Sequence, residues 1–222
     1  KLRQLGIGGK LLEWITDFLS GRYSRVGVRG EFCSWMEVLS GVPQGSVLGP
    51  LFFLTYVNDL PDWMKCQIRL FADDTKLWKG IATKEDSLEL QLDLDNLMRW
   101  SMIWQLKFNA AKCKVMHVGH TLETSYFLRV DDIKRQLAET TEERDLGVIV
   151  TNDLKPAGQC VKAAARAMSV IGMIGRQFKK LDKEDFLILY KSFIRPHVEY
   201  CIQAWSPYRR KDIQCLETVQ RR

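Results

Sequence analysis

Two adjacent aspartates, Asp73 and Asp74, lie between two short runs that favour β-strand, Ile68–Phe71 and Lys76–Trp78. Neighbouring side chains of a regular strand point to opposite faces, so the two carboxylates can serve one site only at a hairpin tip or a bulge. Two negative charges at one exposed turn repel each other, and bound cations would offset this repulsion. Hard divalent ions are the natural candidates. The pair therefore predicts a hairpin whose turn holds metal. The alternative is a solvated turn, because aspartate readily bonds its own backbone.

The composition is that of a folded globular protein with a moderate positive charge. Its 222 residues are enough for one large or two small domains, and 46% of them are hydrophobic, which excludes global disorder. The net charge of +6 favours an anionic partner such as a nucleic acid, although the same charge also serves solubility.

Cysteine and histidine spacing gives no indication of a zinc site. The six cysteines form no Cys-x-x-Cys pair, and His117, His120 and His197 do not complete a zinc-binding spacing. We therefore expect reduced thiols in an intracellular protein. The longest apolar run, Val47–Val57, is about half of what spans a bilayer, and no cleavable signal pattern is present. We expect a nuclear or cytoplasmic location and no membrane partner.

The first 150 residues mix helical and strand-like patterns. Two strand-like runs flank Arg29–Gly30 and predict a hairpin there. A Gly-rich loop, Ser40–Gly49, precedes an apolar run that predicts a buried helix from Pro50 to about Leu60. Thr83 and Asp86 resemble a capping box with Asp in place of Glu, which predicts the start of a long helix.

The last third of the chain is helical in pattern. Strands are predicted over Cys113–Val118 and Leu146–Val150, and helical spacing then takes over in Gly158–Phe178. Asp182 can cap a further helix that runs through Ile194, before Pro196 ends or kinks it.

Three motifs make the chain resemble the reverse transcriptases of LINE-type (non-LTR) retrotransposons. They are Gly-Val-Pro-Gln-Gly-Ser-Val-Leu-Gly-Pro at 41–50, Phe-Ala-Asp-Asp-Thr-Lys-Leu at 71–77 and Asn-Ala-Ala-Lys at 109–112. The segment Ile194–Cys201, followed by Ala204 and Trp205, also resembles the region after the polymerase motifs of these elements. The resemblance covers nearly the whole chain. Phe71, where maturases and retroviral enzymes usually have Tyr, disfavours a maturase-like splicing cofactor.

The resemblance implies an α+β fold of polymerase type. Residues 1–150 would form a partial palm, an antiparallel sheet with helices on one face, and residues 151–222 a helical thumb. The implied activity is that of an RNA-directed DNA polymerase that uses Mg²⁺, or Mn²⁺, for two-metal nucleotidyl transfer. The implied partners are an RNA template, a DNA primer, a dNTP and the rest of the retrotransposon polyprotein.

The same resemblance gives individual residues their expected roles. Asp73 is expected to be the stronger metal ligand and Asp74 the auxiliary one. Lys112, with Lys114 as the alternative, is expected to act as general acid or to pair with phosphate. The residues expected at the nucleotide and template are Gly41, Pro43, Gln44, Gly45, Phe71 and Ala72, and those expected to support the primer are Leu146 and Gly147.

Simpler structural roles compete with several of these expectations. Lys112 could equally be a surface lysine, and Gly147 could mark a bulge within an ordinary strand. Leu51, Phe52, Phe53 and Tyr56 are most simply core residues. Trp78, Trp100 and Trp104 could stack on bases, but core packing is the simpler expectation.

The third metal-binding aspartate of such enzymes belongs to a strand upstream of the first helix in this sequence. The only aspartate in residues 1–40 is Asp17, which lies in an amphipathic helix pattern and fits a solvated helix surface. We therefore expect a fragment truncated at the N-terminus, without the fingers and the first Asp strand, that does not polymerise alone. The alternative is a non-catalytic nucleic-acid-binding relic, or a fragment reused by its host.

Overall fold

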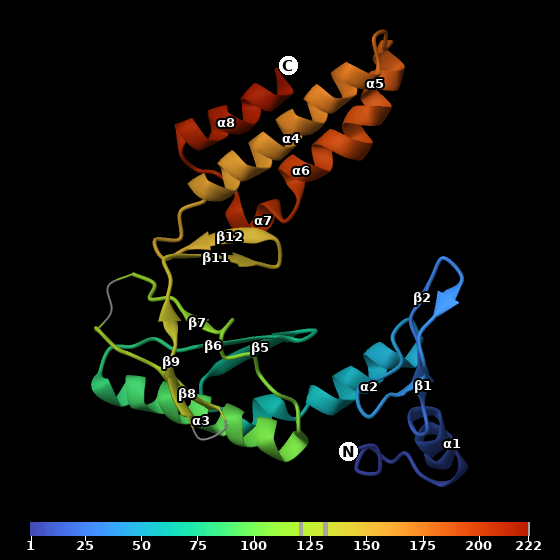
Figure 1. Ribbon diagram of the computed structural model, residues 1–222. Coiled ribbons are helices and arrows are strands. Elements are labelled where there is room, and N and C mark those ends of the chain that lie inside the picture. Colours follow the sequence, from blue (N-terminus) through green and yellow to red (C-terminus); the bar gives the residue numbers. More distant parts are fainter. Residues whose placement is uncertain (120–121, 131–132, 222) are drawn as a thin grey trace. The chain divides into compact units, whose positions relative to one another are not determined.

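The computed structural model describes residues 1–119, 122–130 and 133–221. His120, one of the three histidines considered for a zinc-binding spacing, lies outside the described residues. The chain forms two compact units, Lys1–Phe108 and Asn109–Arg222 (Figure 1). Both contain helices and strands, which confirms the α+β class. The units divide at residue 108, whereas the expected palm–thumb boundary lies at 150. The assignment of palm and thumb therefore remains a prediction.

The first unit consists of ten elements. In chain order they are α1 (Gly9–Leu19), β1 (Tyr23–Ser24), β2 (Gly27–Val28), β3 (Glu31–Phe32), β4 (Met36–Glu37), α2 (Leu48–Val57), the 3-10 helix η1 (Leu60–Trp63), β5 (Gln67–Phe71), β6 (Asp74–Trp78) and α3 (Lys84–Trp104). The hairpin predicted at Arg29–Gly30 is confirmed, because β2 pairs with β3 and both turn residues have positive φ, at 51° and 90°. Positive φ at both central positions is the signature of a type I′ turn.

The core of the first unit joins α2, η1, the β5–β6 hairpin and α3. Its buried members are Val57, Leu60, Ile68, Leu97 and Trp100. The predicted capping box starts α3: the Thr83 hydroxyl accepts the N–H of Asp86, and the Asp86 carboxylate accepts the N–H of Thr83. Trp100 is fully buried, as the core-packing expectation required.

Helix α2 differs from its prediction in extent and in burial. It begins at Leu48, with Pro50 in the first turn, and ends at Val57. Val57 and Phe53 pack into the core, but Leu51 and Leu54 are 55% and 57% exposed. The prediction of a buried helix with Leu51 in the core is therefore wrong, because only one side of this uniformly apolar helix is covered.

The second unit holds three strand pairs and a helical bundle. Its elements are β7 (Lys114–Val115), β8 (Phe127–Val130), β9 (Ile133–Gln136), β10 (Ala138–Glu139), β11 (Glu142–Asp145), β12 (Val148–Thr151), α4 (Ala157–Gln177), α5 (Lys183–Leu189), the π-helical turn η2 (Tyr190–Ile194), α6 (Arg195–Glu199), α7 (Ile202–Trp205) and α8 (Arg210–Gln220). The strand predicted at 146 begins only at Val148, because Leu146 and Gly147 form the turn between β11 and β12.

Strand pairing differs from the expected palm sheet. Within the described residues the strands form six separate two-stranded sheets, of which only β7–β10 is parallel. Most of these strands have two to four residues, which is short for a sheet member. Helix α3 does cover one face of the β5–β6 hairpin, through Leu97 and Trp100.

Three helices of the second unit, α4, α6 and α8, lie side by side (Figure 1). Ala164 and Ala167 of α4 are buried against Ile194, Val198 and Val219, and such small residues let helices approach closely. The predicted helix starting at Asp182 is confirmed, since the Asp182 carboxylate accepts the N–H of Asp185 at 2.8 Å. No helix in the described part of the chain is long and apolar enough to cross a membrane.

Asp86 should make the stability of the first unit depend on pH. Its bonds from the backbone of Thr83 and Ala82 lower the pKa of its carboxyl below the usual 3.8. A lowered folded-state pKa stabilises the fold above the unfolded-state pKa, and this contribution is lost as the pH falls through the folded-state pKa. We expect the free energy of unfolding, measured in urea, to fall more steeply from about pH 5 to about pH 2 in the wild type than in Asp86→Asn.

The matched control is Glu85→Gln, since Glu85 is an exposed acid of the same helical turn. This variant should keep the wild-type slope. Parallel curves for wild type and Asp86→Asn would contradict the role of the capping carboxylate.

Candidate active site

The Asp pair lies at the tip of the β5–β6 hairpin. The strands pair in register from Gln67 opposite Trp78 to Phe71 opposite Asp74, which leaves Ala72 and Asp73 as a two-residue loop. Asp73 is therefore a loop residue, Asp74 is the first residue of β6, and both are exposed. The predicted hairpin is confirmed, and the two carboxylates lie where the strand alternation breaks.

The turn contains backbone strain. Ala72 has φ of +50°, in the left-handed region that residues with a Cβ avoid. This conformation costs about 1–2 kcal/mol for an L-residue other than glycine. Strained residues persist where the surrounding structure fixes them, and they concentrate at functional sites. The observation supports a functional role for this turn.

The two faces of the hairpin have opposite characters. Ile68, Leu70 and Leu77 face the core, and they hold the hairpin against α2 and α3. The other face is exposed and places Arg69 opposite Lys76, next to the Phe71–Asp74 pair. The Asp74 carboxylate thus lies on the same face as two cationic side chains, whose positive charge makes the electrostatic potential at the tip less negative.

Both carboxylates of the tip are available to a ligand. Across residues 1–119, 122–130 and 133–221, neither Asp73 nor Asp74 has a side-chain hydrogen bond or ion pair. Carboxylate oxygens are the ligands that Mg²⁺ and Mn²⁺ prefer, so their chemistry fits a divalent ion. Two such donors do not complete a site, and the described residues contain no group of three metal-binding side chains.

Asp93 of α3 fixes the base of the hairpin. Its Oδ2 accepts the backbone N–H groups of Lys65 and Cys66, at 2.8 and 2.6 Å, immediately before β5. The Asp93 side chain is completely buried. Burial, together with the neighbouring Asp93, raises the pKa of the Cys66 thiol to about 12, so Cys66 stays protonated and structural.

Two glycines of the Gly-rich loop before α2 have backbone conformations that favour glycine. Gly41 and Gly45 both have positive φ, at 79° and 80°. Gln44 and Gly45 form an exposed turn closed by a bond from Ser46 N to Pro43 O, and Gly at its third position with positive φ is typical of type II. The Ser46 hydroxyl accepts the N–H of Gly49 at 3.0 Å, which joins the loop to the first turn of α2.

Lys112 and Lys114 differ in their surroundings in the second unit. The Lys114 ammonium pairs with Glu143, and this bond lowers the pKa of the Glu143 carboxyl. Lys112 lies in an exposed turn, where its N–H bonds Asn109 O at 2.9 Å. Its ammonium makes no ion pair with any described residue. Of the two, Lys112 is the one available to an anionic ligand.

The Leu146–Gly147 turn is a tight hairpin loop and not the bulge considered from the sequence. Asp145 lies opposite Val148, so only two residues form the loop. Both have positive φ, 44° for Leu146 and 91° for Gly147, as in a type I′ turn. Leu146 is a residue with a Cβ in this region, so the turn is strained like that at Ala72.

Two side chains that position these turns were not singled out from the sequence. Asp93 lies on the stripe of α3 that carries Leu90, Leu94 and Leu97, and an acid among core-facing positions is a signal that could have identified it. Gln159 is buried in α4, where its Oε1 accepts the N–H of Ile149 at 2.9 Å. Its helical position alone carried no such signal.

Residues 1–173 match the family described as reverse transcriptase (RNA-dependent DNA polymerase), and the chain belongs to this family. This confirms the family membership that the three motifs predicted, and the enzyme class with it. No solved structure shows significant similarity to the chain.

The similar curated proteins are polymerases of mobile elements. The chain is 25% identical to the RNA-directed DNA polymerase from mobile element jockey of Drosophila funebris over 223 residues, covering 95% of this chain and 24% of that protein. The jockey polymerase of Drosophila melanogaster is 34% identical over 112 residues, 45% of this chain and 12% of that protein. The probable RNA-directed DNA polymerase from transposon X-element is 22% identical over 93% of this chain. The chain spans 24% of the length of the first and third of these proteins.

Replacing Asp93 should destabilise the first unit. In Asp93→Ala the buried N–H groups of Lys65 and Cys66 lose their acceptor, so the free energy of unfolding should fall by about 2–3 kcal/mol. Asp93→Asn keeps one acceptor oxygen and should lose less. The measurement is urea unfolding. The control is Asp95→Ala, two residues along on the exposed side, which should change stability by less than about 0.5 kcal/mol. Equal losses at 93 and 95 would contradict the anchoring role.

Proposed function

We propose that the chain is a partial palm and the thumb of an RNA-directed DNA polymerase encoded by a non-LTR retrotransposon. One observation carries the proposal: two exposed carboxylates without side-chain partners, at 73 and 74, form the tip of a strained hairpin in a reverse transcriptase. The substrates are then an RNA template, a DNA primer and a dNTP, and the rest of the polyprotein completes the enzyme.

Nucleotide addition joins the primer 3′ oxygen to the α-phosphorus of the dNTP and releases pyrophosphate. Bound Mg²⁺ ions, or Mn²⁺ in their place, would supply the neutralising charge that this reaction needs. Asp73, in the loop itself, is the stronger oxygen ligand in this proposal, and Asp74 is the auxiliary one. The strained turn keeps both carboxylates at the tip, where side chains of the unit do not occupy their oxygens.

The Gly-rich loop is proposed to contact the nucleotide and the template. Gln44 and Gly45 are exposed at the turn, and Gly41 and Pro43 shape it. Without a Cβ at Gly45, backbone can approach a base or a phosphate closely. Phe71 and Ala72, beside the Asp pair, are proposed to contact the same ligands, and Phe71 is 63% exposed although it is aromatic. An exposed aromatic residue next to a charged tip is suited to contact a sugar or a base.

Lys112 is proposed to assist the departure of pyrophosphate. Its ammonium can pair with a phosphate oxygen or donate a proton as the leaving group forms. Lys114 is the weaker candidate because it already pairs with Glu143. Leu146 and Gly147 are proposed to support the primer strand at their turn.

A nuclear or cytoplasmic location belongs to the same proposal. All six cysteines are free, which fits a reducing compartment. The competing proposal is a non-catalytic relic that binds nucleic acid, favoured only by the net charge of +6. The genomic flank separates them, since an upstream Asp strand and an endonuclease domain favour the polymerase, whereas stop codons or an unrelated exon favour the relic.

Divalent-ion binding tests the polymerase proposal. We expect the chain to bind Mn²⁺, measured by electron paramagnetic resonance, in the presence of a poly(rA)/oligo(dT) duplex and dTTP. Loss of a direct charged ligand should weaken binding at least about tenfold in Asp73→Asn, and less in Asp74→Asn. The control is Asp62→Asn, an exposed acid of η1, which should bind as the wild type does. Unchanged Mn²⁺ binding in the double variant at 73 and 74 would reject the metal role of the tip.

A further inference from the structure

The turn proposed to support the primer is in direct contact with Tyr200, which follows α6. The Tyr200 hydroxyl donates a hydrogen bond to Leu146 O at 2.9 Å. Its ring lies against Gly147, where an added Cβ would be only 3.2 Å from Tyr200 Cε1. One side chain thus holds both residues of a two-residue loop, through a polar bond to one and van der Waals contact with the other.

Tyr200 is itself fixed by its backbone. Its N–H donates to Pro196 O at 3.0 Å, and its carbonyl oxygen accepts the indole N–H of Trp205 at 2.8 Å. Trp205 is buried in the core beneath α4. Because both backbone groups of Tyr200 are bonded, its Cα–Cβ direction is fixed relative to α6 and α7.

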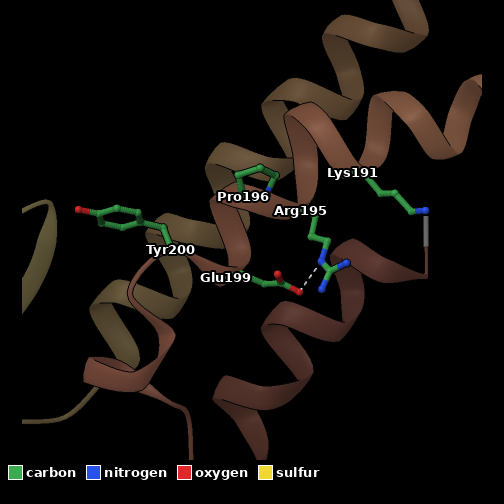
Figure 2. Close-up of a pocket in the computed structure, with 5 residues that line it drawn as sticks. All are labelled: Lys191, Arg195, Pro196, Glu199 and Tyr200. Carbon is green, nitrogen blue, oxygen red and sulfur yellow. Dashed lines mark hydrogen bonds and ion pairs between the residues drawn. The ribbon is translucent and has the colours of Figure 1, made fainter.

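The ring points to the turn and not to the nearby charged groups. Figure 2 shows Tyr200 directed away from the Arg195–Glu199 ion pair, at the edge of a hollow of about 480 Å³ lined by Lys191, Arg195, Pro196, Glu199 and Tyr200. The Tyr200 side chain is 57% exposed, so it is not a core residue. Its contacts with Leu146 and Gly147 are therefore its main structural role.

Helix α4 holds the same turn on its β12 side. The buried Gln159 accepts the N–H of Ile149 at 2.9 Å, and the Lys162 ammonium reaches Gly147 O at 3.4 Å. The strained loop is in this way held at its tip by Tyr200 and at the start of β12 by α4. Several contacts of this kind are needed to hold Leu146 in its left-handed conformation, because that conformation is strained.

We propose that Tyr200 is a positioning residue that sets the place of the Leu146–Gly147 turn, and with it the primer 3′ end, relative to the helices of the second unit. The proposal rests on the proposed function, because only a polymerase gives this turn a primer to place. It assigns a role to the segment after the polymerase motifs, which joins the turn proposed to support the primer to the helices of the second unit.

The first measurement is amide hydrogen exchange of residues 146–149 in the free full chain. Tyr200→Phe removes only the hydroxyl, and exchange there should quicken by about two- to tenfold, as loss of one hydrogen bond allows. Tyr200→Leu also removes the ring contact and should quicken it further. The control is Tyr208→Phe, since Tyr208 is an exposed tyrosine without a hydrogen bond to the turn. Equal protection in the wild type and Tyr200→Leu would overturn the proposal.

The second measurement separates positioning from stability. A poly(rA)/oligo(dT) duplex with 4-thiothymidine at the primer 3′ end is cross-linked to the full chain and the adducts are mapped. The wild type should cross-link at 146–147, and Tyr200→Leu should lose at least about fivefold of that yield, because small misplacements abolish a reactive geometry. Duplex affinity should change less than about twofold, because phosphate contacts dominate it. Tyr200→Phe should restore most of the yield.

The two failures have different signatures. An unchanged cross-link yield in Tyr200→Leu, with the wild type reacting at the turn, overturns the positioning role. A wild type that binds the duplex but never cross-links at 146–147 overturns the primer role of the turn and, with it, the consequence for the 3′ end. In that case hydrogen exchange still decides whether Tyr200 holds the turn.

Discussion

The Asp93 carboxylate accepts two backbone N–H groups inside the first unit, and the Asp93 side chain is completely buried. Those bonds tie the start of β5 to α3, and the apolar face of the hairpin then packs onto the same helix. With its base held in this way, the hairpin can present two like charges and a strained Ala72 at its tip. The chemistry proposed for the tip therefore depends on this buried anchor as well as on the two carboxylates.

The same arrangement recurs in the second unit. A two-residue loop with a left-handed residue other than glycine ends a short hairpin, and the side chains of Tyr200, after α6, and of Gln159, in α4, hold this hairpin. In both units an exposed turn contains a left-handed residue other than glycine, Ala72 or Leu146, whereas the groups that place the turn are hydrogen-bonded to backbone. This division explains how two-stranded hairpins, which have little stability by themselves, can hold functional residues at precise positions.

Local signals in the sequence predicted the hairpins and helices well. The capping box at Thr83, the Asp182 cap and the Arg29–Gly30 turn each form as expected, because a few neighbouring residues determine them. The burial of α2 could not be predicted, since a uniformly apolar run does not show which side is covered. The Asp pair was identified from its motif, but Tyr200 was not, because its partners lie more than 50 residues away and only the fold brings them together.

The π-helical turn η2 lies between α5 and α6, just before Pro196. A π-turn holds one residue more than an α-turn in the same length, so it takes up that residue without changing the rotational phase of the helix that follows. Each residue of an α-helix advances the chain by about 100°. Deleting one residue within Tyr190–Ile194 would therefore give a regular helix and keep Tyr200 directed at Leu146 and Gly147, whereas deleting one residue of α6 would rotate Tyr200 away from them. The π-turn is thus a place where the chain tolerates a change in length that α6 does not.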